Sequence, residues 1–342
     1  MKKNLLQSSL LIYKCVLLST TFIATSCSSD SNDTEPVDTS IQADYVAKIG
    51  STKDITINNN GEVKYIGMEE TSDFYELSLK TVDIEGNVRK LTTLDFNTYY
   101  ANNMGVAADD SGNILFVNDF NTSGKNINQY SPSSNSISSY TVKHLSSAPI
   151  NNARMNVIRK FDNNSYIVFD YSTFSIRRYM PNLATDVQIV GSGTSGTTDG
   201  VGINGSFSGV SDIAVHDNSL AYVIDQWGKS LRKIELVNGQ YKITTLVTSA
   251  NEEYRDISTD DQGNLLVLLS NKGIFKFSKT SGALEPYLTG ELKVSTKKPS
   301  DYGIKTNWES VSLFFVKNAD IYVKYGESLI KISNYKAKLN VQ

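Results

Sequence analysis

The 342-residue chain contains only two cysteines and two histidines. Cys15 lies in an apolar N-terminal segment that we expect to be removed, and Cys27 follows that segment directly. If the first is lost and the second is blocked, the mature chain has no thiol for a disulfide, thiol catalysis or cysteine-ligated zinc. His144 and His216 fall in loops that we expect on opposite faces, which excludes a shared metal or a histidine acid–base pair.

The chain also lacks a concentrated basic run. Removal of the N-terminal segment takes three lysines and leaves 30 basic against 36 acidic residues. Nucleic-acid binders concentrate positive charge on one surface, because phosphate contacts dominate their affinity. The composition therefore argues against a nucleic-acid partner.

No apolar run is long enough for a comfortable membrane span. Residues 1–26 instead have the layout of a signal peptide, with Lys2 and Lys3 at the start, an apolar core, and the small residues Ala24-Thr-Ser26 before Cys27. Ala-Thr-Ser-Cys resembles a bacterial lipobox, in which the cysteine becomes the lipidated first residue. Ala24 departs from the usual leucine, so ordinary secretion after Ser26 is the alternative.

The segment after Cys27 is polar and acidic, and we expect residues 27–43 to form a disordered tether. It resembles the acidic segment that follows the cysteine in surface-exported lipoproteins of some Gram-negative bacteria. The resemblance implies several acyl chains as the membrane anchor. It also implies an outer-membrane location at the cell surface, with the periplasmic side as the alternative.

The rest of the chain contains one unit repeated six times. Each unit has a short β-type run, a turn rich in Asn, Asp and Gly, and a second run that is apolar at most positions. The intervals between successive units are 51, 51, 56, 44 and 54 residues, counted from a series of anchor residues: Ile55, Val106, Val157, Ile213, Ile257 and Val311.

Four strands can be recognised in most units, and second strands such as Leu265–Leu269 are apolar on both faces. A strand that is apolar on both faces lies in a sheet that is covered on both sides. Four short strands in about 50 residues, repeated around a ring, are typical of a β-propeller blade. We therefore predict an all-β six-bladed β-propeller over residues 44–336, followed by a C-terminal tail of residues 337–342.

The sixth unit ends after three strands, whereas a spare strand precedes the first unit at Asp44–Gly50. Pairing this N-terminal strand with the last blade would close the ring and cover an exposed sheet edge. A flat sandwich would show similar strands, but it would explain neither the period nor the displaced strand.

One unit carries a family resemblance. The glycine-rich stretch Asp199–Phe207, followed by Asp212-Ile-Ala-Val215, Tyr222-Val-Ile-Asp225 and Leu231-Arg-Lys-Ile234, resembles NHL-repeat propellers. No helix is expected after this loop, so it lacks the dipole that a phosphate-binding loop would need. We expect the glycines to let a long loop fold over the blade edge.

The site is expected on the face that carries the loops from strand four to the next blade and from strand two to strand three. The residues two or three positions before each anchor, together with the exposed Trp227, are the ligand-binding candidates: Lys53, Asn103, Arg154, Trp227, Tyr254, Arg255, Trp308 and Glu309. Arginine and aromatic side chains together suit a glycan or an anionic ligand. The alternative is that these side chains cap strand ends, and that Trp227 packs on the Gly191–Gly209 loop.

Three aspartates end second strands: Asp119, Asp170 and Asp225. Calcium takes six to eight oxygen ligands, but we expect these carboxylates to cap the following loops instead. Lactonases of the related propeller class hold calcium with Glu, Asn and Asp around the channel. Glu309, Asn103 and Asn156 could imitate that set, although Arg154 and Arg255 beside them would oppose a cation.

The sequence shows no catalytic constellation, and we expect no cofactor. We therefore predict a non-catalytic binding or scaffolding propeller, anchored by lipid at Cys27, whose partner is a glycan, a peptide or a surface protein. A calcium-dependent lactonase- or lyase-like enzyme is the alternative, and a structural subunit of a surface complex is a third reading.

Overall fold

The computed structural model describes residues 40–71, 75–95, 104–117, 127–140, 155–295 and 308–339. The chain divides into two units, Met1–Asp38 and Thr39–Gln342, and all described residues belong to the second. Cys27, Asn103, Asp119, His144 and Arg154 lie outside the described residues. No helix in the described part of the chain has the length and apolar character needed to cross a bilayer.

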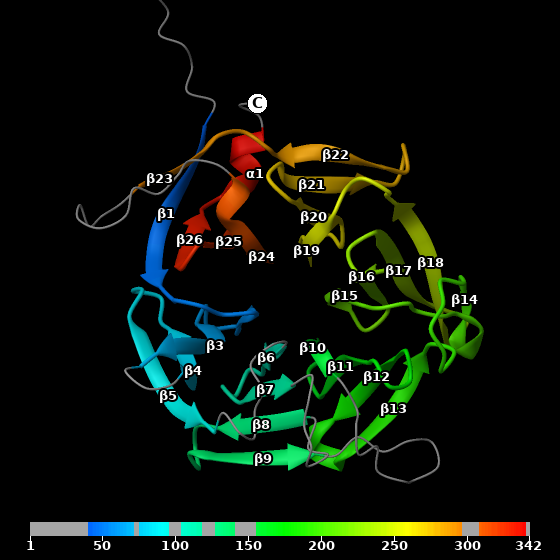
Figure 1. Cartoon of the computed structure of the whole chain (residues 1–342), viewed down its shortest axis with the longest axis horizontal. Helices are drawn as coiled ribbons and strands as arrows, with labels where there is room; N and C mark the ends of the chain where they lie inside the picture. Colours follow the sequence, from blue (N-terminus) through cyan, green and yellow to red (C-terminus); the bar gives the residue numbers. More distant parts are fainter. Residues whose placement is uncertain are drawn as a thin grey trace, which may run out of the picture. The chain divides into compact units, whose positions relative to one another are not determined.

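Six sheets form the predicted six-bladed β-propeller, with their inner strands around a common centre (Figure 1). From the centre outwards, blade 1 consists of β2 (Ile55–Ile57), β3 (Val63–Glu70), β4 (Tyr75–Val82) and β5 (Val88–Leu94). Blade 2 consists of β6 (Val106–Ala108), β7 (Ile114–Val117), β8 (Ile127–Ser131) and β9 (Ser136–Tyr140). Blade 3 consists of β10 (Met155–Asp162), β11 (Ser165–Asp170), β12 (Ser175–Met180) and β13 (Thr185–Val190).

Blade 4 consists of β15 (Asp212–Asp217), β16 (Leu220–Asp225), β17 (Ser230–Val237), β18 (Gln240–Thr248) and β14 (Gly200–Val201). Blade 5 consists of β19 (Tyr254–Thr259), β20 (Leu265–Leu269), β21 (Gly273–Ser278) and β22 (Ala283–Leu288). Blade 6 consists of β24 (Val311–Lys317), β25 (Asp320–Tyr325), β26 (Ser328–Ile332), β1 (Ile41–Lys48) and β23 (Leu292–Ser295). The short helices are η1 (Pro181–Leu183), η2 (Gly202–Asn204), η3 (Trp308–Ser310) and α1 (Tyr335–Lys338).

The ring closes through the N-terminal strand, as the displaced terminal strand predicted. β1 pairs antiparallel with β26 on one side and parallel with β23 on the other. The sixth blade therefore contains strands from both ends of the described chain. β1 is also no edge strand, because both of its hydrogen-bonding edges are occupied.

The core lies between neighbouring blades. Every residue of β7, β11 and β20 is buried, as expected for strands covered on both faces. Side chains of one blade pack on those of the next, for example Leu115 and Val117 of blade 2 with Ile158 and Val168 of blade 3. Because each blade buries its apolar faces only against its neighbours, stability depends on closure of the whole ring.

The hairpin turns between first and second strands explain the paired aspartates in the sequence. The carboxylate of Asp109 accepts hydrogen bonds from the backbone N–H groups of Ser111 and Asn113. Asp260 accepts from Gln262 and Asn264 in the same way. These are local Asx-type turns, and their geometry accounts for the residues that form them.

The register of the inner strands corrects two anchors. Ile55, Val106, Ile213 and Ile257 occupy equivalent positions, but the equivalent residues in blades 3 and 6 are Ile158 and Phe314. Val157 and Val311 were wrong as anchors by one and three residues. An apolar run offers several residues that could serve as its first inward position, and the pattern alone does not choose among them.

Candidate functional site

A cavity of about 210 Å³ occupies the central channel. Residues of five inner strands line it, namely β2, β10, β15, β19 and β24. Buried aspartates mark the level at which the strands begin, whereas the residues toward the hairpin turns, such as Ile57, Ser258 and Val316, are half-buried. The channel therefore combines a polar cluster at one level with a more open, mixed wall at the other.

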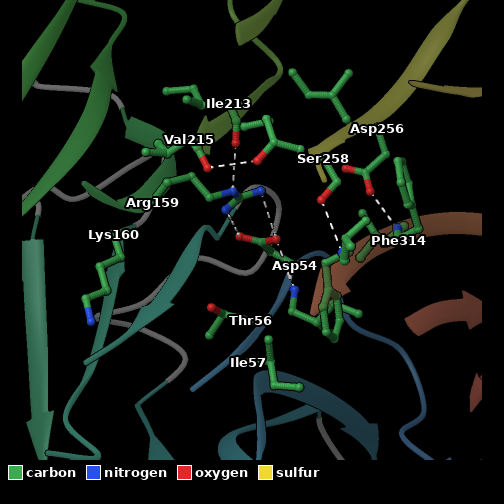
Figure 2. A pocket seen from close by; sticks show the side chains of 17 residues that line it. Asp54, Thr56, Ile57, Arg159, Lys160, Ile213, Val215, Asp256, Ser258 and Phe314 are labelled. Carbon is green, nitrogen blue, oxygen red and sulfur yellow. Dashed lines mark hydrogen bonds and ion pairs between the residues drawn. The ribbon is translucent and has the colours of Figure 1, made fainter. Parts of the chain in front are cut away.

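Asp54 and Arg159 form the centre of this cluster, and Figure 2 shows the guanidinium between Asp54 and the Ile213 carbonyl. Arg159 Nη1 lies 2.6 Å from Asp54 Oδ2, and Nη2 lies 3.2 Å from Oδ1. The same carboxylate accepts hydrogen bonds from the backbone N–H groups of Ile55 and Val106. Asp54 of blade 1 thus bonds to blade 2 and, across the channel, to blade 3.

Asp212 and Asp256 extend the cluster to the remaining blades. Arg159 Nη2 donates to Asp212 Oδ1 at 2.6 Å, and Asp212 Oδ2 accepts from the N–H of Ile257. Asp256 Oδ2 accepts from the N–H of Phe314 in blade 6. We call the four side chains of Asp54, Arg159, Asp212 and Asp256 the channel hub, because their hydrogen bonds join all six blades.

The hub holds three carboxyl groups against one guanidinium. Burial raises the pKa of Asp256 well above its usual value, and both the charge of Asp212 and a hydrogen bond between the two carboxyl groups add to this rise. Burial also raises the pKa of Asp54, against the attraction of Arg159. A proton on Asp256 lets that carboxyl donate to Asp212, which relieves the repulsion between two buried carboxylates.

The hydrogen-bonding capacity of Arg159 is fully used inside the hub. Nε donates to the Ile213 carbonyl, Nη1 to Asp54 and the Ile158 carbonyl, and Nη2 to Asp54 and Asp212. A guanidinium has five N–H donors. No donor of Arg159 is left to bind a ligand, so the geometry gives the hub a connecting role.

A metal ion does not fit the described residues. No group of three or more Asp, Glu, His or Cys side chains among them is arranged to hold one. In the channel, the guanidinium of Arg159 already occupies the place between Asp54 and Asp212 where a cation would be attracted. Of the lactonase-like set, Asn156 donates its amide to Tyr171 and the Val210 carbonyl, and Asn103 lies outside the described residues.

The turn between β16 and β17 presents the most exposed aromatic ring on the expected face. Trp227 is 65% exposed and stacks on Tyr171 of blade 3, with ring centroids 5.5 Å apart and planes at 18°. Tyr171 is itself fixed, because its hydroxyl donates to the Val210 carbonyl at 2.9 Å. We call this pair of rings the Trp227 platform.

The backbone under the platform is unusual. Gln226 and Trp227 both have φ of 55°, followed by Gly228 at 90°. Bulky residues rarely adopt positive φ, since the Cβ then crowds the backbone. The ring also lies against Gly209, where an added Cβ would meet Trp227 Cε2 at 2.6 Å. The two readings of Trp227 therefore coexist: one face packs on the Gly191–Gly209 loop, while most of the side chain stays exposed.

The other expected residues divide into an exposed and a buried group. Lys53, Arg255 and Glu309 are exposed, and Arg255 has no ion pair with the described residues. Tyr254 and Trp308 are 3% and 5% exposed, and Trp308 Nε1 donates to the Gly290 carbonyl. These two rings were expected to approach the channel, but both are apolar and belong to core clusters instead, with Tyr254 at the start of β19 and Trp308 in η3 just before β24.

The aspartates that end second strands cap loops, as expected. Asp170 accepts from Ser172 and Thr173, and Asp225 accepts from the N–H groups of Ser208, Gly209 and Gln226. Both side chains are fully buried; backbone and hydroxyl donors satisfy Asp170 and Asp225 Oδ1, and Arg232 donates to Asp225 Oδ2. Asp119 lies outside the described residues.

The glycine-rich loop is held by a second buried arginine. Arg232 is fully buried and donates to Asp225, to Asp199 and to the carbonyls of Thr198 and Ser206. Asp199 also accepts from Thr245, and these hydrogen bonds lower the pKa of Asp199 despite its partial burial. β14 then adds to β18 as a fifth strand, so the loop folds over the edge of blade 4 as expected.

Sequence reasoning missed the channel hub, although a signal was present. Three anchors read Asp-Ile, and in each the aspartate directly precedes the anchor: Asp54, Asp212 and Asp256. The candidate site residues were those two or three positions before the anchors, so these three aspartates were not among them. Arg159 had no such signal, because its partners come from other blades.

The sequence matches no family model, and no curated protein is significantly similar to it. Solved structures are similar in fold. A gluconolactonase from Xanthomonas campestris has a TM-score of 0.56 at 10% identity, covering 84% of this chain and 88% of its own. Virginiamycin B lyase from Staphylococcus aureus has a TM-score of 0.53 at 12% identity, covering 84% and 95%.

A Bacteroides thetaiotaomicron protein of unknown function has a TM-score of 0.47 at 12% identity; the match covers 83% of this chain but only 59% of that longer protein. Likeness at such low identity shows architecture and leaves chemistry to the individual site. The comparisons and the sheet topology agree on one conclusion: the chain is a six-bladed β-propeller of the architecture that lactonases and lyases also use.

Proposed function

We propose that the protein is a non-catalytic NHL-class binding propeller, anchored by lipid at Cys27 at the bacterial cell surface, that binds a saccharide on the Trp227 platform. One observation carries the binding role. Trp227 is 65% exposed, yet it is held in place by its stack on Tyr171 and its contact with Gly209. An exposed ring that is already ordered loses little entropy when a ligand binds.

A saccharide suits this surface better than a purely apolar ligand. The free face of an indole stacks on the C–H face of a sugar ring, while hydroxyl groups need polar partners around it. Blade 5 begins beside the platform, since the N–H of Tyr254 donates to the Gly228 carbonyl. Arg255 follows directly and is exposed, and its guanidinium, which has no ion pair with the described residues, can serve as a hydrogen-bond donor.

The surface location is supported by the sequence alone. Ala24-Thr-Ser26 before Cys27 and the acidic segment that follows suit a lipidated residue on a polar tether. Metabolic labelling with a palmitate analogue tests this, since labelling is expected for the native chain and lost in Cys27→Ala. Protease accessibility in intact cells then separates the surface from the periplasmic side.

A lactonase- or lyase-like enzyme is the second candidate. The observation that favours it is the pair Asp212–Asp256 in the channel, where burial and the neighbouring carboxyl group raise the pKa of Asp256 well above its usual value. The N–H donors of Arg159 are all used in hydrogen bonds within the protein, which argues against a catalytic role for the hub. Calorimetric titration of the full chain with calcium tests the calcium-dependent form, which requires binding at or below millimolar calcium.

The binding role is tested with the full chain in detergent on a glycan array, followed by titration of the strongest ligand. Trp227→Ala is expected to weaken binding about fivefold or more, because aromatic stacking contributes on the order of 1 kcal/mol. Leu183→Ala, at a position that is 70% exposed on blade 3, is the matched control and should bind like the native chain. Equal binding by Trp227→Ala would remove the platform from the site.

A further inference from the structure

A second cleft, of about 510 Å³, lies at the seam where the ring closes. It is lined by β1 and the β25–β26 turn on one side and by β3, β4 and the start of β5 on the other. In Figure 1 these are the blue β1 and the neighbouring blade of β3 to β5. We call it the seam cleft. It is distinct from the channel and from the Trp227 platform, which lies on blades 3 and 4.

The wall of the seam cleft contains a buried hydroxyl without a partner. Tyr65 is fully buried, and its hydroxyl makes no hydrogen bond with any residue that the structure describes. Burial raises the pKa of this phenol, so it stays protonated and keeps a donor. Leaving such a group unsatisfied costs about 1–3 kcal/mol. A native protein rarely carries that cost without a role for the group.

A buried ammonium lies beside this hydroxyl. The Lys80 side chain is 7% exposed and forms an ion pair with Glu69. Lysine has three N–H donors, and Glu69 is its only partner among the described residues. Two donors of Lys80 therefore have no partner in the part of the chain that the structure describes.

Gly67 brings these two groups to one place. An added Cβ at Gly67 would lie 3.2 Å from Lys80 Cδ and 3.3 Å from Tyr65 Cε2, so both side chains extend over this glycine. The absence of a side chain at Gly67 leaves room above them. The phenol and the ammonium can therefore reach the same ligand.

The rim of the cleft indicates what kind of ligand fits. Three glutamates and two lysines line the cleft, so its formal charge is −1 and an anion is disfavoured: Glu69, Glu70, Glu327, Lys48 and Lys80. Glu69 already forms an ion pair with Lys80, so the cleft offers a cation no buried carboxylate that lacks an ion pair. Tyr75 is 52% exposed at the rim and offers an aromatic face.

We propose that the seam cleft is a second binding site, which takes a neutral saccharide of about two sugar rings. Sugar hydroxyl groups both accept and donate, so they satisfy Tyr65 and the spare donors of Lys80 together. The ring of Tyr75 stacks on the apolar face of a sugar unit. The site does not depend on the Trp227 platform, and its ligand contacts the first and last blades at once.

Titration calorimetry and thermal unfolding of the full chain in detergent test this, with maltose, cellobiose, lactose and N,N′-diacetylchitobiose as probes. At least one is expected to bind at millimolar concentration and to raise the unfolding temperature, since a ligand that binds only the closed ring stabilises it. Tyr65→Phe should weaken that binding about tenfold while leaving the free protein as stable as before or more so. Failure of all four probes to bind overturns the proposal, as does native affinity in Tyr65→Phe.

Two further variants separate this site from the Trp227 platform. Gly67→Ala should weaken disaccharide binding, because its methyl group would displace the Lys80 side chain. Trp227→Ala should leave the part of the disaccharide binding that depends on Tyr65 unchanged. If Trp227→Ala abolishes all saccharide binding and Tyr65→Phe has no effect, the platform is the binding site and the proposal for the seam cleft is wrong. If Tyr65→Phe abolishes saccharide binding and Trp227→Ala has no effect, the seam cleft is the binding site and the proposal for the platform is wrong.

Discussion

The channel hub and the Trp227 platform differ in what they leave unused. The hub has the features that usually draw attention to a site, namely a cavity, buried charges and a raised carboxyl pKa. Yet the donors of Arg159 are all spent on other residues of the hub and its strands. In the platform, by contrast, an ordered ring stays 65% exposed.

The difference teaches that perturbed electrostatics and binding capacity are separate properties. A buried ion network shifts pKa values whether it binds a ligand or only joins strands. What marks a site is a group that is fixed in place and still lacks a partner. Trp227 and Tyr65 meet that condition in different ways, and Arg159 does not.

The largest expected effect breaks the hub. Arg159→Met leaves Asp54 and Asp212 buried without their cation, and such a change costs about 3–5 kcal/mol of unfolding free energy. Chemical denaturation with fluorescence detection measures the loss. Arg255→Met is the matched control, because Arg255 is exposed, and it should lie within about 0.5 kcal/mol of the native chain. A small effect at Arg159 would show that the hub does not hold the ring together.

A smaller effect concerns the proton on Asp256. Because its pKa is raised in the folded state, its contribution to stability is complete at acidic pH and is lost as the pH rises through the folded pKa. Asp256→Asn keeps a donor for Asp212 and an acceptor for the Phe314 N–H without the titration.

The difference in unfolding free energy between Asp256→Asn and the native chain should therefore be near zero at acidic pH and increasingly favour the variant as the pH rises. Denaturation curves at several pH values measure it. A difference that stays constant with pH would contradict a shared proton in the hub. Asp261→Asn, at an exposed turn aspartate whose pKa is lowered by Lys336, is the control without that upward trend.

The smallest expected effect on stability concerns the Trp227 platform. Gly209→Ala places a methyl group 2.6 Å from Trp227 Cε2, so the ring must shift. The ring is largely exposed and can move, so the unfolding free energy should change by less than about 1 kcal/mol. The tryptophan emission and the saccharide affinity should change clearly. Leu183→Ala, at an exposed position on blade 3, is the control and should leave the tryptophan emission unchanged.

Much of the fold could be predicted from the sequence, because it depends on local patterns. The repeat interval, the turn residues and the doubly apolar strands fixed six blades, and the spare strand at Asp44–Gly50 predicted the closure by β1. Register was harder. Blades 3 and 6 have Val157 and Leu313 where blades 1, 4 and 5 have an aspartate, so nothing polar marks the start of the inward-facing run.

The site could be predicted only in part, for a related reason. Trp227, in the turn between β16 and β17, and Arg255, near the start of β19, are exposed as expected. The partners of Arg159 come from blades 1 and 4, more than 50 residues away in each direction. The role of Tyr65 could not be predicted from the sequence either, because a hydroxyl group lacks a partner only if none of its spatial neighbours offers one. Both features are relations between blades.

The position of β1 has a mechanical consequence. The chain that precedes Ile41 leaves the ring at the end of β1 away from the β25–β26 turn, because Lys48 at the other end pairs with Ser328. A pull on that chain is therefore applied to a strand that is bonded on both edges, to β26 and to β23. To open the ring, it must break two ladders at once. The closing strand is thus also the element best suited to carry load.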